Sequence, residues 1–312
     1  MSEGARMMAL EKISRSFFLS LSKNKVLNIG AKKWGLGLGA SQVVAGTTIE
    51  SMIKTVSQLN NEGLLCTVDH LGEFVLSKEE ARYATKKCIE TLEAIATSGV
   101  NCQLSVKLTQ LGLDIDDQFC LENMKEIMKV AKKFHNFVQI DMEDYSRKKA
   151  TLEILAALRE SYDNVGTVIQ AYLYDAEDDV EMLKGMPLRL VKGAYKEQEV
   201  VAFQDKARID NQYLRIIKKH LMNGSYTAIG SHDHVIIDKV IEFANQNGIP
   251  RTQFEFQMLY GFRTDLQKDL VDKGYTMRVY VPFGEDWYGY FMRRLAERPQ
   301  NVTFALKGLL SK

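Results

Sequence analysis

Short β-branched or apolar runs alternate with longer helical segments along most of the chain, and this alternation restricts the fold more than any other feature. Roughly 20 to 40 residues separate neighbouring runs, and most of them repeat apolar residues at the i, i+3, i+4 spacing of a helix. The predicted strands cover residues 64–68, 102–108, 137–141, 165–172, 188–191, 226–230, 253–258 and 277–281. Eight such units predict an α/β fold, a closed and distorted (βα)8 TIM-like barrel; an open doubly wound sheet remains an alternative, because periodicity does not exclude it.

The domain organisation follows from the few chain breakers. The 312 residues include only four prolines, and no stretch is rich in Gly, Ser and Pro. We therefore expect one barrel domain over residues 45–312, preceded by a helical extension over residues 1–44 that packs outside the barrel.

Charge and cysteine content exclude several classes of protein. Lys and Arg number 41 against 40 Asp and Glu, so the net charge of +1 argues against a nucleic-acid partner. The cysteines form no CxxC pair, which favours reduced thiols over a disulfide framework. The first residues lack a signal pattern, and no run approaches about 18 apolar residues. We expect a cytoplasmic protein without a membrane span.

Reactive side chains cluster where the predicted strands end, which is where barrels place their functional groups. In chain order they are Asp69, Glu73, Lys107, Asp141, Glu143, Asp144, Gln170, Tyr172, Arg189, Lys192, His232 and Tyr280. An acidic run such as residues 140–144 is usually a solvated loop. Here it closes a strand, so we expect Asp141 to pair with Lys107 from the neighbouring strand.

The last predicted helix carries Tyr290, Arg293, Arg294 and Glu297 at i, i+3, i+4 and i+7, so these residues share one face. The helix can be an ordinary surface helix with an Arg293 to Glu297 pair. Two adjacent guanidinium groups also form a fork for a carboxylate or phosphate. Because the eighth strand leads directly into it, we expect this helix to lie over the active site at the barrel mouth.

Two other motifs carry less weight. The glycines of residues 34–39 have the wrong spacing for a dinucleotide fingerprint, and no strand precedes them. His232 and His234, with Asp69 and His70, could instead serve a metal-dependent hydrolase, which is a rival interpretation. We predict no metal, because a hydrogen-bonding role at a strand end accounts for such histidines.

In this order, eight motifs make the sequence resemble the bacterial proline dehydrogenases, both the monofunctional enzymes and the matching domain of the bifunctional ones. The resemblance runs from about residue 40 to residue 300. The motifs are DHLGE (69–73), VKL (106–108), IDME (140–143), QAY (170–172), RLVKGAY (189–195), EFQ (255–257), RVYVPFG (278–284) and YFMRRLAE (290–297).

This resemblance implies a barrel with non-covalent FAD that oxidises L-proline to Δ1-pyrroline-5-carboxylate, the first step of proline degradation to glutamate. Electrons would pass to a quinone or another acceptor, and a pyrroline-5-carboxylate dehydrogenase would act downstream. The implied substrate-site residues are Lys107, Arg293 and Arg294 for the carboxylate, Tyr195, Leu259, Tyr280 and Tyr290 around the ring, Asp141 beside Lys107, and Glu73 as a gate paired with Arg293. The implied flavin contacts are Gln170, Arg189, Lys192, Gly193, Ser231, His232, Gln257 and Glu297, with Arg189 close to the reactive N5 atom.

Several points stay open. Residues 231–233 read Ser-His-Asp, where the family commonly has Thr-His-Asn, so Asp233 adds a charge near the expected cofactor. The segment 302–310 can be a docked terminal helix or a peripheral contact with the inner face of the membrane; we favour docking, because it lacks a strongly basic face. A barrel that only senses proline is a third, non-enzymatic interpretation.

Overall fold

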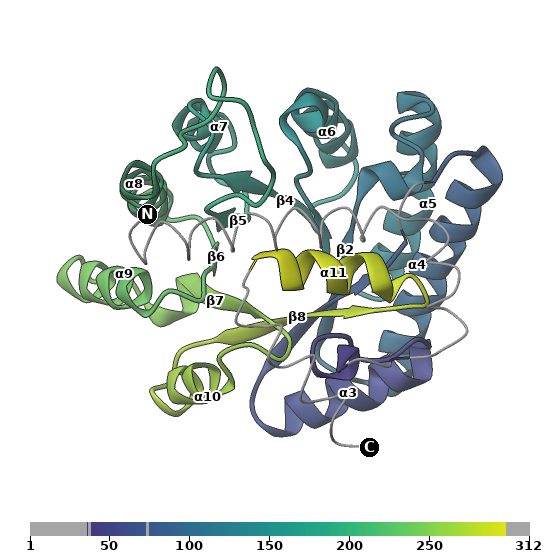
Figure 1. The fold of residues 1–312 in the computed structure, drawn as a ribbon, viewed down its shortest axis with the longest axis horizontal. Helices are drawn as coiled ribbons and strands as arrows, with labels where there is room; N and C mark the ends of the chain where they lie inside the picture. Colours follow the sequence, from purple (N-terminus) through teal and green to yellow (C-terminus); the bar gives the residue numbers. More distant parts are fainter. Residues whose placement is uncertain (1–35, 37–38, 73–74, 298–312) are drawn as a thin grey trace, which may run out of the picture.

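Eight parallel strands close into a barrel in the computed structural model, which describes residues 36, 39–72 and 75–297 (Figure 1). Each strand pairs with its neighbours in chain order, and β8 pairs with β1 to complete the ring. The closed ring confirms the predicted fold and excludes the open sheet. The strands are β1 Leu65–His70, β2 Cys102–Val106, β3 Val138–Ile140, β4 Val165–Gln170, β5 Leu188–Val191, β6 Thr227–Gly230, β7 Phe254–Leu259 and β8 Met277–Phe283.

Helices surround the strands and bury an apolar layer against them (Figure 1). They are α3 Ile49–Asn61, α4 Lys78–Ser98, α5 Asp117–Lys133, α6 Tyr145–Arg159, α7 Ala176–Met182, α8 Lys206–Met222, α9 His234–Gln246, α10 Thr264–Asp272 and α11 Trp287–Glu297, with short 3-10 turns η1 Ala40–Gln42, η2 Leu108–Leu111 and η3 Arg251–Gln253. Several begin at a side-chain cap typical of helix starts: Ser77, Asp116, Asp205 and Asp233 accept hydrogen bonds from first-turn amides of α4, α5, α8 and α9.

The interior of the barrel is polar, unlike the branched apolar layers common in this fold. In β1, Cys66 and Val68 belong to the apolar layer under the helices, whereas Thr67 and Asp69 are buried polar residues. The same alternation continues around the ring and brings together Ser105, Gln139, Gln170, Arg189, Glu255, Gln257 and Arg278, all of them buried. Period-two alternation therefore separates a packing face from a chemical face on each strand.

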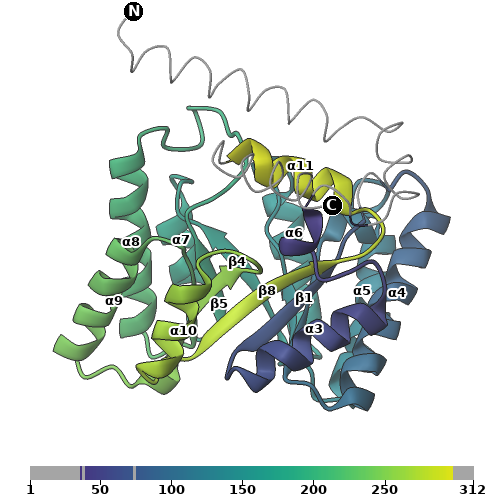
Figure 2. The same ribbon diagram turned by 60° about the horizontal axis from the view of Figure 1, so that its bottom comes forward.

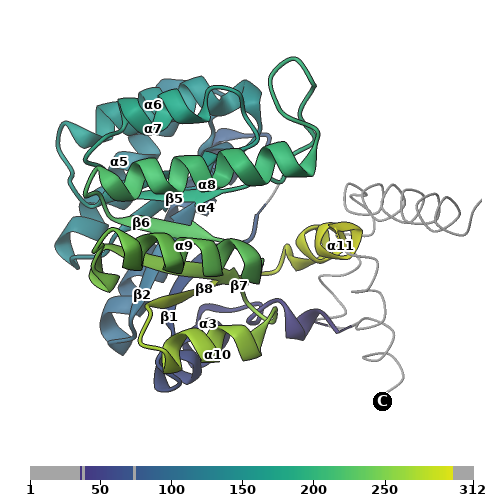
Figure 3. The ribbon, with the colours of Figure 1, turned by 90° about the vertical axis from the view of Figure 1, so that its left-hand side faces the viewer.

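The last helix leaves the outer ring, and this is the distortion of the barrel. α3, which precedes β1, packs against β1 and β8, where a regular barrel places the helix that follows β8. β8 leads instead through a turn at Gly284 into α11, which lies across the end of the barrel (Figures 2 and 3). Gly284 has φ +128°, and a Cβ there would be 3.1 Å from the carbonyl oxygen of Leu71. The helix predicted over the barrel mouth is thus confirmed.

The predicted N-terminal extension falls almost wholly outside the described residues, as does the segment 302–310. Within residues 1–44, the structure describes residues 36 and 39–44, which include η1. In the described part of the chain, no helix combines the length and the apolar character that crossing a membrane requires. The four cysteines are all free and buried.

Candidate active site

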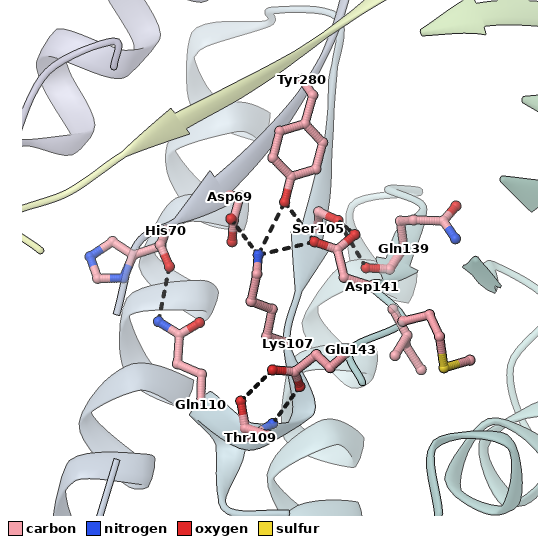
Figure 4. Close-up of polar contacts among 12 residues, drawn as sticks. Asp69, His70, Ser105, Lys107, Thr109, Gln110, Gln139, Asp141, Glu143 and Tyr280 are labelled. Atoms are coloured by element: carbon pink, nitrogen blue, oxygen red, sulfur yellow. Dashed lines mark hydrogen bonds and ion pairs between the residues drawn. The ribbon is translucent and has the colours of Figure 1, made fainter. Parts of the chain in front are cut away.

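Lys107 lies at the centre of a largely buried ionic cluster at the C-terminal end of the strands (Figure 4). Its Nζ atom is 2.6 Å from Oδ2 of Asp69 and 3.0 Å from Oδ2 of Asp141. The same atom donates a hydrogen bond of 3.2 Å to the hydroxyl oxygen of Tyr280. An ammonium group has three N–H donors, so each donor of Lys107 has a partner. The expected pairing of Asp141 with Lys107 is present.

Asp141 joins four strands of the barrel through its two carboxylate oxygens. Oδ2 accepts a 2.6 Å hydrogen bond from the Tyr280 hydroxyl in addition to the contact with Lys107. Oδ1 accepts 2.7 Å hydrogen bonds from Oγ of Ser105 and from Nη1 of Arg189. Residues from β2, β5 and β8 therefore meet on the side chain that directly follows β3.

The charges in this cluster stabilise one another. Burial alone would raise the pKa of Asp141, but Lys107 and Arg189 outweigh it and hold that pKa at about 2. Burial alone would lower the pKa of Lys107, but Asp69, Tyr280 and Asp141 together raise it well above its usual value. Burial and the two carboxylates raise the pKa of Tyr280 well above its usual value. At neutral pH, Asp141 is therefore ionised, Lys107 is charged and Tyr280 keeps its proton.

Unpartnered polar atoms lie at the ends of β4 and β5, beside this cluster. Arg189 uses Nη1 on Asp141, while its buried Nε and Nη2 atoms have no hydrogen-bond partner. Gln170 donates from Nε2 to the carbonyl oxygens of Met142 and Glu143, which leaves its buried Oε1 atom without a partner. Buried polar groups in native proteins are normally satisfied. Two donors and one acceptor at this place fit a planar heterocycle that carries both kinds of group, as an isoalloxazine does.

The other expected cofactor residues follow the neighbouring strands. Lys192 and Gly193 come directly after β5, and Gly193 has φ +110° with the Tyr172 ring 2.5 Å from where a Cβ would be, so only glycine fits there. Ser231 and His232 follow β6. Because the backbone N–H of Leu259 donates to Nε2 of His232 at 3.0 Å, a neutral His232 ring carries its proton on Nδ1.

Gln257 lies on β7 with its side-chain amide oriented by a neighbour. Its Nε2 atom donates to Oε1 of Glu255 at 2.5 Å. Glu255 in turn forms a buried ion pair of 2.7 Å with Nε of Arg278. The orientation of Gln257 is therefore fixed by a charged network in the barrel interior.

The helix α11 presents its arginines from above the strands. Trp287, Tyr288, Phe291, Met292 and Leu295 pack with Leu71 and Val44 in a small apolar cluster, which holds the helix in place. Tyr290 joins this cluster, so the polar face expected for the helix is partly buried. Arg293 and Arg294 are half-buried, and the Arg294 guanidinium lies 5.2 Å from the centre of the Tyr290 ring.

Two of the expected ring contacts lie near the ionic cluster. Leu259 ends β7 and pairs in register with Tyr280 on β8. Tyr195 follows β5 and is 41% exposed. Partial burial of its hydroxyl and the negative charge of Glu143 raise the pKa of Tyr195 to about 12, and Lys107, Asp141 and Arg293 contribute smaller shifts.

Some expected residues cannot be placed. Glu73 lies outside the described residues, and so does the side chain of Glu297. The rival metal site does not assemble: within residues 36, 39–72 and 75–297, no three His, Cys, Asp or Glu side chains gather in a way that could hold an ion. Asp69 is bound to Lys107, and the His70 ring packs edge-on against Phe283.

Three residues at or beside the cluster were given no role in the predicted substrate site. Asp69 and Glu143 were expected among the reactive side chains at the strand ends, Asp69 also as a rival metal ligand, and Ser105 was not expected at all. Glu143 fixes the loop beside Lys107, because its carboxylate accepts hydrogen bonds of 2.6 Å and 3.1 Å from Oγ1 and N of Thr109. The sequence pattern that could have identified Asp69 and Ser105 is the polar residue at every second position of β1 and β2.

Comparison with known sequences identifies a family. The model of the family described as proline dehydrogenase matches residues 52–305. Proline dehydrogenase 2 of Bacillus subtilis (strain 168) is 52% identical over 302 residues, which cover 96% of this chain and 100% of the relative. Proline dehydrogenase 1 of the same strain is 48% identical over 300 residues, covering 96% of this chain and 99% of the relative.

Comparison with solved structures agrees with the fold. The crystal structure of proline utilization A from Bdellovibrio bacteriovorus, inactivated by N-propargylglycine, superposes with a TM-score of 0.78 at 29% identity. The match covers 85% of this chain and 32% of that one, so this chain spans about a third of its length.

Proposed function

Because the chain belongs to the proline dehydrogenase family, it is an oxidoreductase that acts on proline in the first step of proline catabolism, and we propose that it uses non-covalent FAD to oxidise L-proline to Δ1-pyrroline-5-carboxylate. The observation that supports this proposal is the set of unpartnered polar atoms on Arg189 and Gln170, directly beside the Lys107 and Asp141 cluster. The free donors and the free acceptor would hold a flavin ring, and the charges of the neighbouring cluster would meet a small zwitterion.

Arg293 and Arg294 would bind the substrate carboxylate, with Lys107 as a third donor. Guanidinium groups suit this task because they present paired N–H donors in a fixed geometry. Lys107 already has three partners, and its contact with Tyr280 is the longest at 3.2 Å. A carboxylate oxygen, which is charged, would replace the Tyr280 hydroxyl as the acceptor of that N–H group.

The charges around the site favour the neutral form of the substrate amine. Around a bound ammonium group, the four cations of Lys107, Arg189 and the two arginines of α11 would outnumber the carboxylates of Asp69 and Asp141, and an excess of like charge lowers an amine pKa. The proton therefore leaves for solvent as the substrate binds, and no strong base is needed. Tyr195, Leu259, Tyr280 and Tyr290 would enclose the ring, hold the carbon next to nitrogen in one position and exclude water.

The flavin contacts proposed for this chain are Gln170, Arg189, Lys192, Gly193, Ser231, His232, Gln257 and Glu297. When bound, FAD would supply the two-electron acceptor for the hydride lost from that ring carbon. Arg189 would supply a positive charge beside the bound acceptor, which would favour the negative charge of the reduced form in a site of low dielectric constant. Its ion pair with Asp141 links the cofactor residues to the substrate residues.

An anaerobic absorbance experiment tests the proposal. We expect the purified protein to be yellow and its flavin absorbance near the visible maximum to be lost when L-proline is added without oxygen. Colourless protein that carries zinc would support the rival hydrolase, and proline binding without loss of absorbance would support a proline sensor. Either result would overturn the proposal. Activity assays with quinones and soluble dyes would then identify the acceptor class.

We expect kcat/KM for L-proline to exceed that for trans-4-hydroxy-L-proline by at least about tenfold, because Tyr280 cannot move aside. Its hydroxyl donates to Asp141 at 2.6 Å, a contact that would remain when Lys107 turns to the substrate carboxylate, and one displaced or crowded group in a packed site costs about 1 to 3 kcal/mol. Steady-state kinetics with both substrates measure the ratio. Equal turnover of the two would show that Tyr280 does not restrict the ring.

The partners and location remain parts of the same proposal. We propose that a quinone or another acceptor reoxidises the flavin and that a separate pyrroline-5-carboxylate dehydrogenase consumes the product. We propose a cytoplasmic protein, with contact to the inner face of the membrane only while a membrane quinone is reduced.

A further inference from the structure

Two lysines and two aspartates form a charged group at the rim of the barrel, between the ends of β5 and β6. Nζ of Lys192 is 2.5 Å from Oδ1 of Asp210 and 3.1 Å from Oδ2 of Asp233. Lys206 also pairs with Asp210 and lies 4.0 Å from Asp233. We call these four residues the rim quartet. The formal charges of the rim quartet sum to zero. The two aspartates therefore neutralise Lys192, which directly follows the strand that carries Arg189.

Asp233 has two separable roles in the rim quartet. Its Oδ1 atom accepts a 3.1 Å hydrogen bond from the backbone N–H of Val235 and so caps α9, while its Oδ2 atom pairs with Lys192. The Lys192 and Asp233 side chains are 26% and 28% exposed, so both can be reached by a ligand at the barrel mouth. Asparagine caps helices about as well as aspartate, so a change to Asn removes the charge and keeps the cap.

The position of the rim quartet suggests which part of a bound FAD would meet it. If the unpartnered atoms of Gln170 and Arg189 hold the ring, as proposed, it would lie at the ends of β4 and β5, while Lys107 and Asp141 occupy the side of β2 and β3. The rest of the cofactor must therefore extend away from the substrate residues. β6 is the next strand in that direction, and there it would meet Lys192 and the first turn of α9. A pyrophosphate requires cations or helix N-termini, and both occur at this place.

We propose that Asp233, together with Asp210, competes with the phosphates of the cofactor for Lys192, and that this competition limits how tightly the protein holds FAD. This inference rests on the proposed function. Both carboxylates lie where they weaken a phosphate site: Asp210 and Asp233 neutralise the lysine, and Asp233 places a negative charge at the positive end of the α9 dipole. Although burial alone would raise the pKa of Asp233, the hydrogen bond from Lys192 lowers it, so the charge persists at neutral pH.

Release of FAD from the holoprotein tests this proposal through the variant Asp233→Asn. Flavin release after dilution is followed by fluorescence of free FAD, at low and at high salt. We expect Asp233→Asn to release FAD roughly three- to tenfold more slowly than the parent at low salt, with a smaller difference at high salt. Asp210→Asn, which removes the second carboxylate of Lys192, should change the rate in the same direction.

Asp116→Asn is the matched control. Asp116 caps α5 by accepting a 2.7 Å hydrogen bond from the N–H of Phe119, so this variant has the same change in net charge and keeps its cap. α5 follows β2, and β3 and β4 separate that strand from β5. We expect its FAD release rate to equal that of the parent.

The experiment distinguishes failure of the proposed function from failure of the inference about Asp233. Parent protein that binds no flavin overturns the proposed function and this inference with it. Flavin-bound protein in which Asp233→Asn releases FAD at the rate of Asp116→Asn, or faster, overturns this inference alone. Faster release would mean that the Asp233 carboxylate binds the cofactor instead of opposing it.

Discussion

The variant Arg294→Met should lose about 100- to 1,000-fold in kcat/KM for L-proline while it keeps its fold and its flavin. A charge-assisted, paired hydrogen bond in a partly buried site contributes roughly 2 to 5 kcal/mol, and methionine retains most of the length and none of the donors. Arg294 lies half-buried on α11 with its guanidinium 5.2 Å from the Tyr290 ring centre. Much of the loss should appear in KM, since the carboxylate does not react, and part in kcat through poorer positioning of the ring.

L-Prolinamide separates the carboxylate contact from general damage to the site. The parent should strongly prefer proline over this neutral analogue, and the preference should largely disappear in Arg294→Met. Arg251→Met is a matched control, because Arg251 also lies over a tyrosine ring, at 4.5 Å from the centre of Tyr275, but belongs to η3 at the opposite ends of the strands. Folded, flavin-bound Arg294→Met with the kcat/KM of the parent would show that α11 does not bind the carboxylate.

The strands were predictable because each one has a face that packs under helices. Their periodicity marks eight apolar runs, and the structure has a strand in each of them. The errors lie at the ends. Residues 107 and 108 were predicted to continue β2, but the chain turns into η2 after Lys107. β8 continues through Pro282, beyond its predicted end, because Pro282 lies at the C-terminal end of the strand, where its carbonyl accepts a hydrogen bond from Ala45 outside the sheet.

Within the candidate site, only contacts between residues that end neighbouring strands could be predicted from the sequence. Lys107 and Asp141 end neighbouring strands, so their contact could be expected before the structure was known. Arg189 reaches Asp141 from β5, two strands away, because the interior of a closed barrel brings non-neighbouring strands within side-chain length. Such a contact depends on the curvature of the barrel, which the local sequence does not encode.

The role of Asp69 shows the same limit. It could be assigned to a strand end, but its partner depends on which way Lys107 points. In the structure, Lys107 turns toward β1 and β3 at once and is shared by two carboxylates. Sequence reasoning considered one carboxylate for this lysine and therefore left Asp69 without a role in proline oxidation.

The variant Asp141→Asn should be the most destabilised single substitution in this cluster, by about 3 to 5 kcal/mol. The neutral amide would leave Lys107 and Arg189 buried without the carboxylate they share, and removing one partner of a buried ion pair costs about this much. Ser105→Ala removes only one hydrogen bond to the same carboxylate and should cost about 1 kcal/mol. Asp69→Asn leaves Lys107 paired with Asp141, so its loss of unfolding free energy should lie between those of Ser105→Ala and Asp141→Asn. Urea unfolding of the flavin-bound proteins at neutral pH gives the order.

The pH dependence of unfolding distinguishes this electrostatic account from simple loss of packing. The pKa of Asp141 is about 2 in the folded protein, below its ordinary value of 3.8, so its contribution to stability is fully present above the ordinary value and is lost as the pH falls toward 2. Asp141→Asn has no such group, so its free energy of unfolding should fall less steeply than that of the parent between these pH values. Equal slopes, or an Asp141→Asn protein as stable as Ser105→Ala, would mean that the charge of Asp141 does not hold the four strands together.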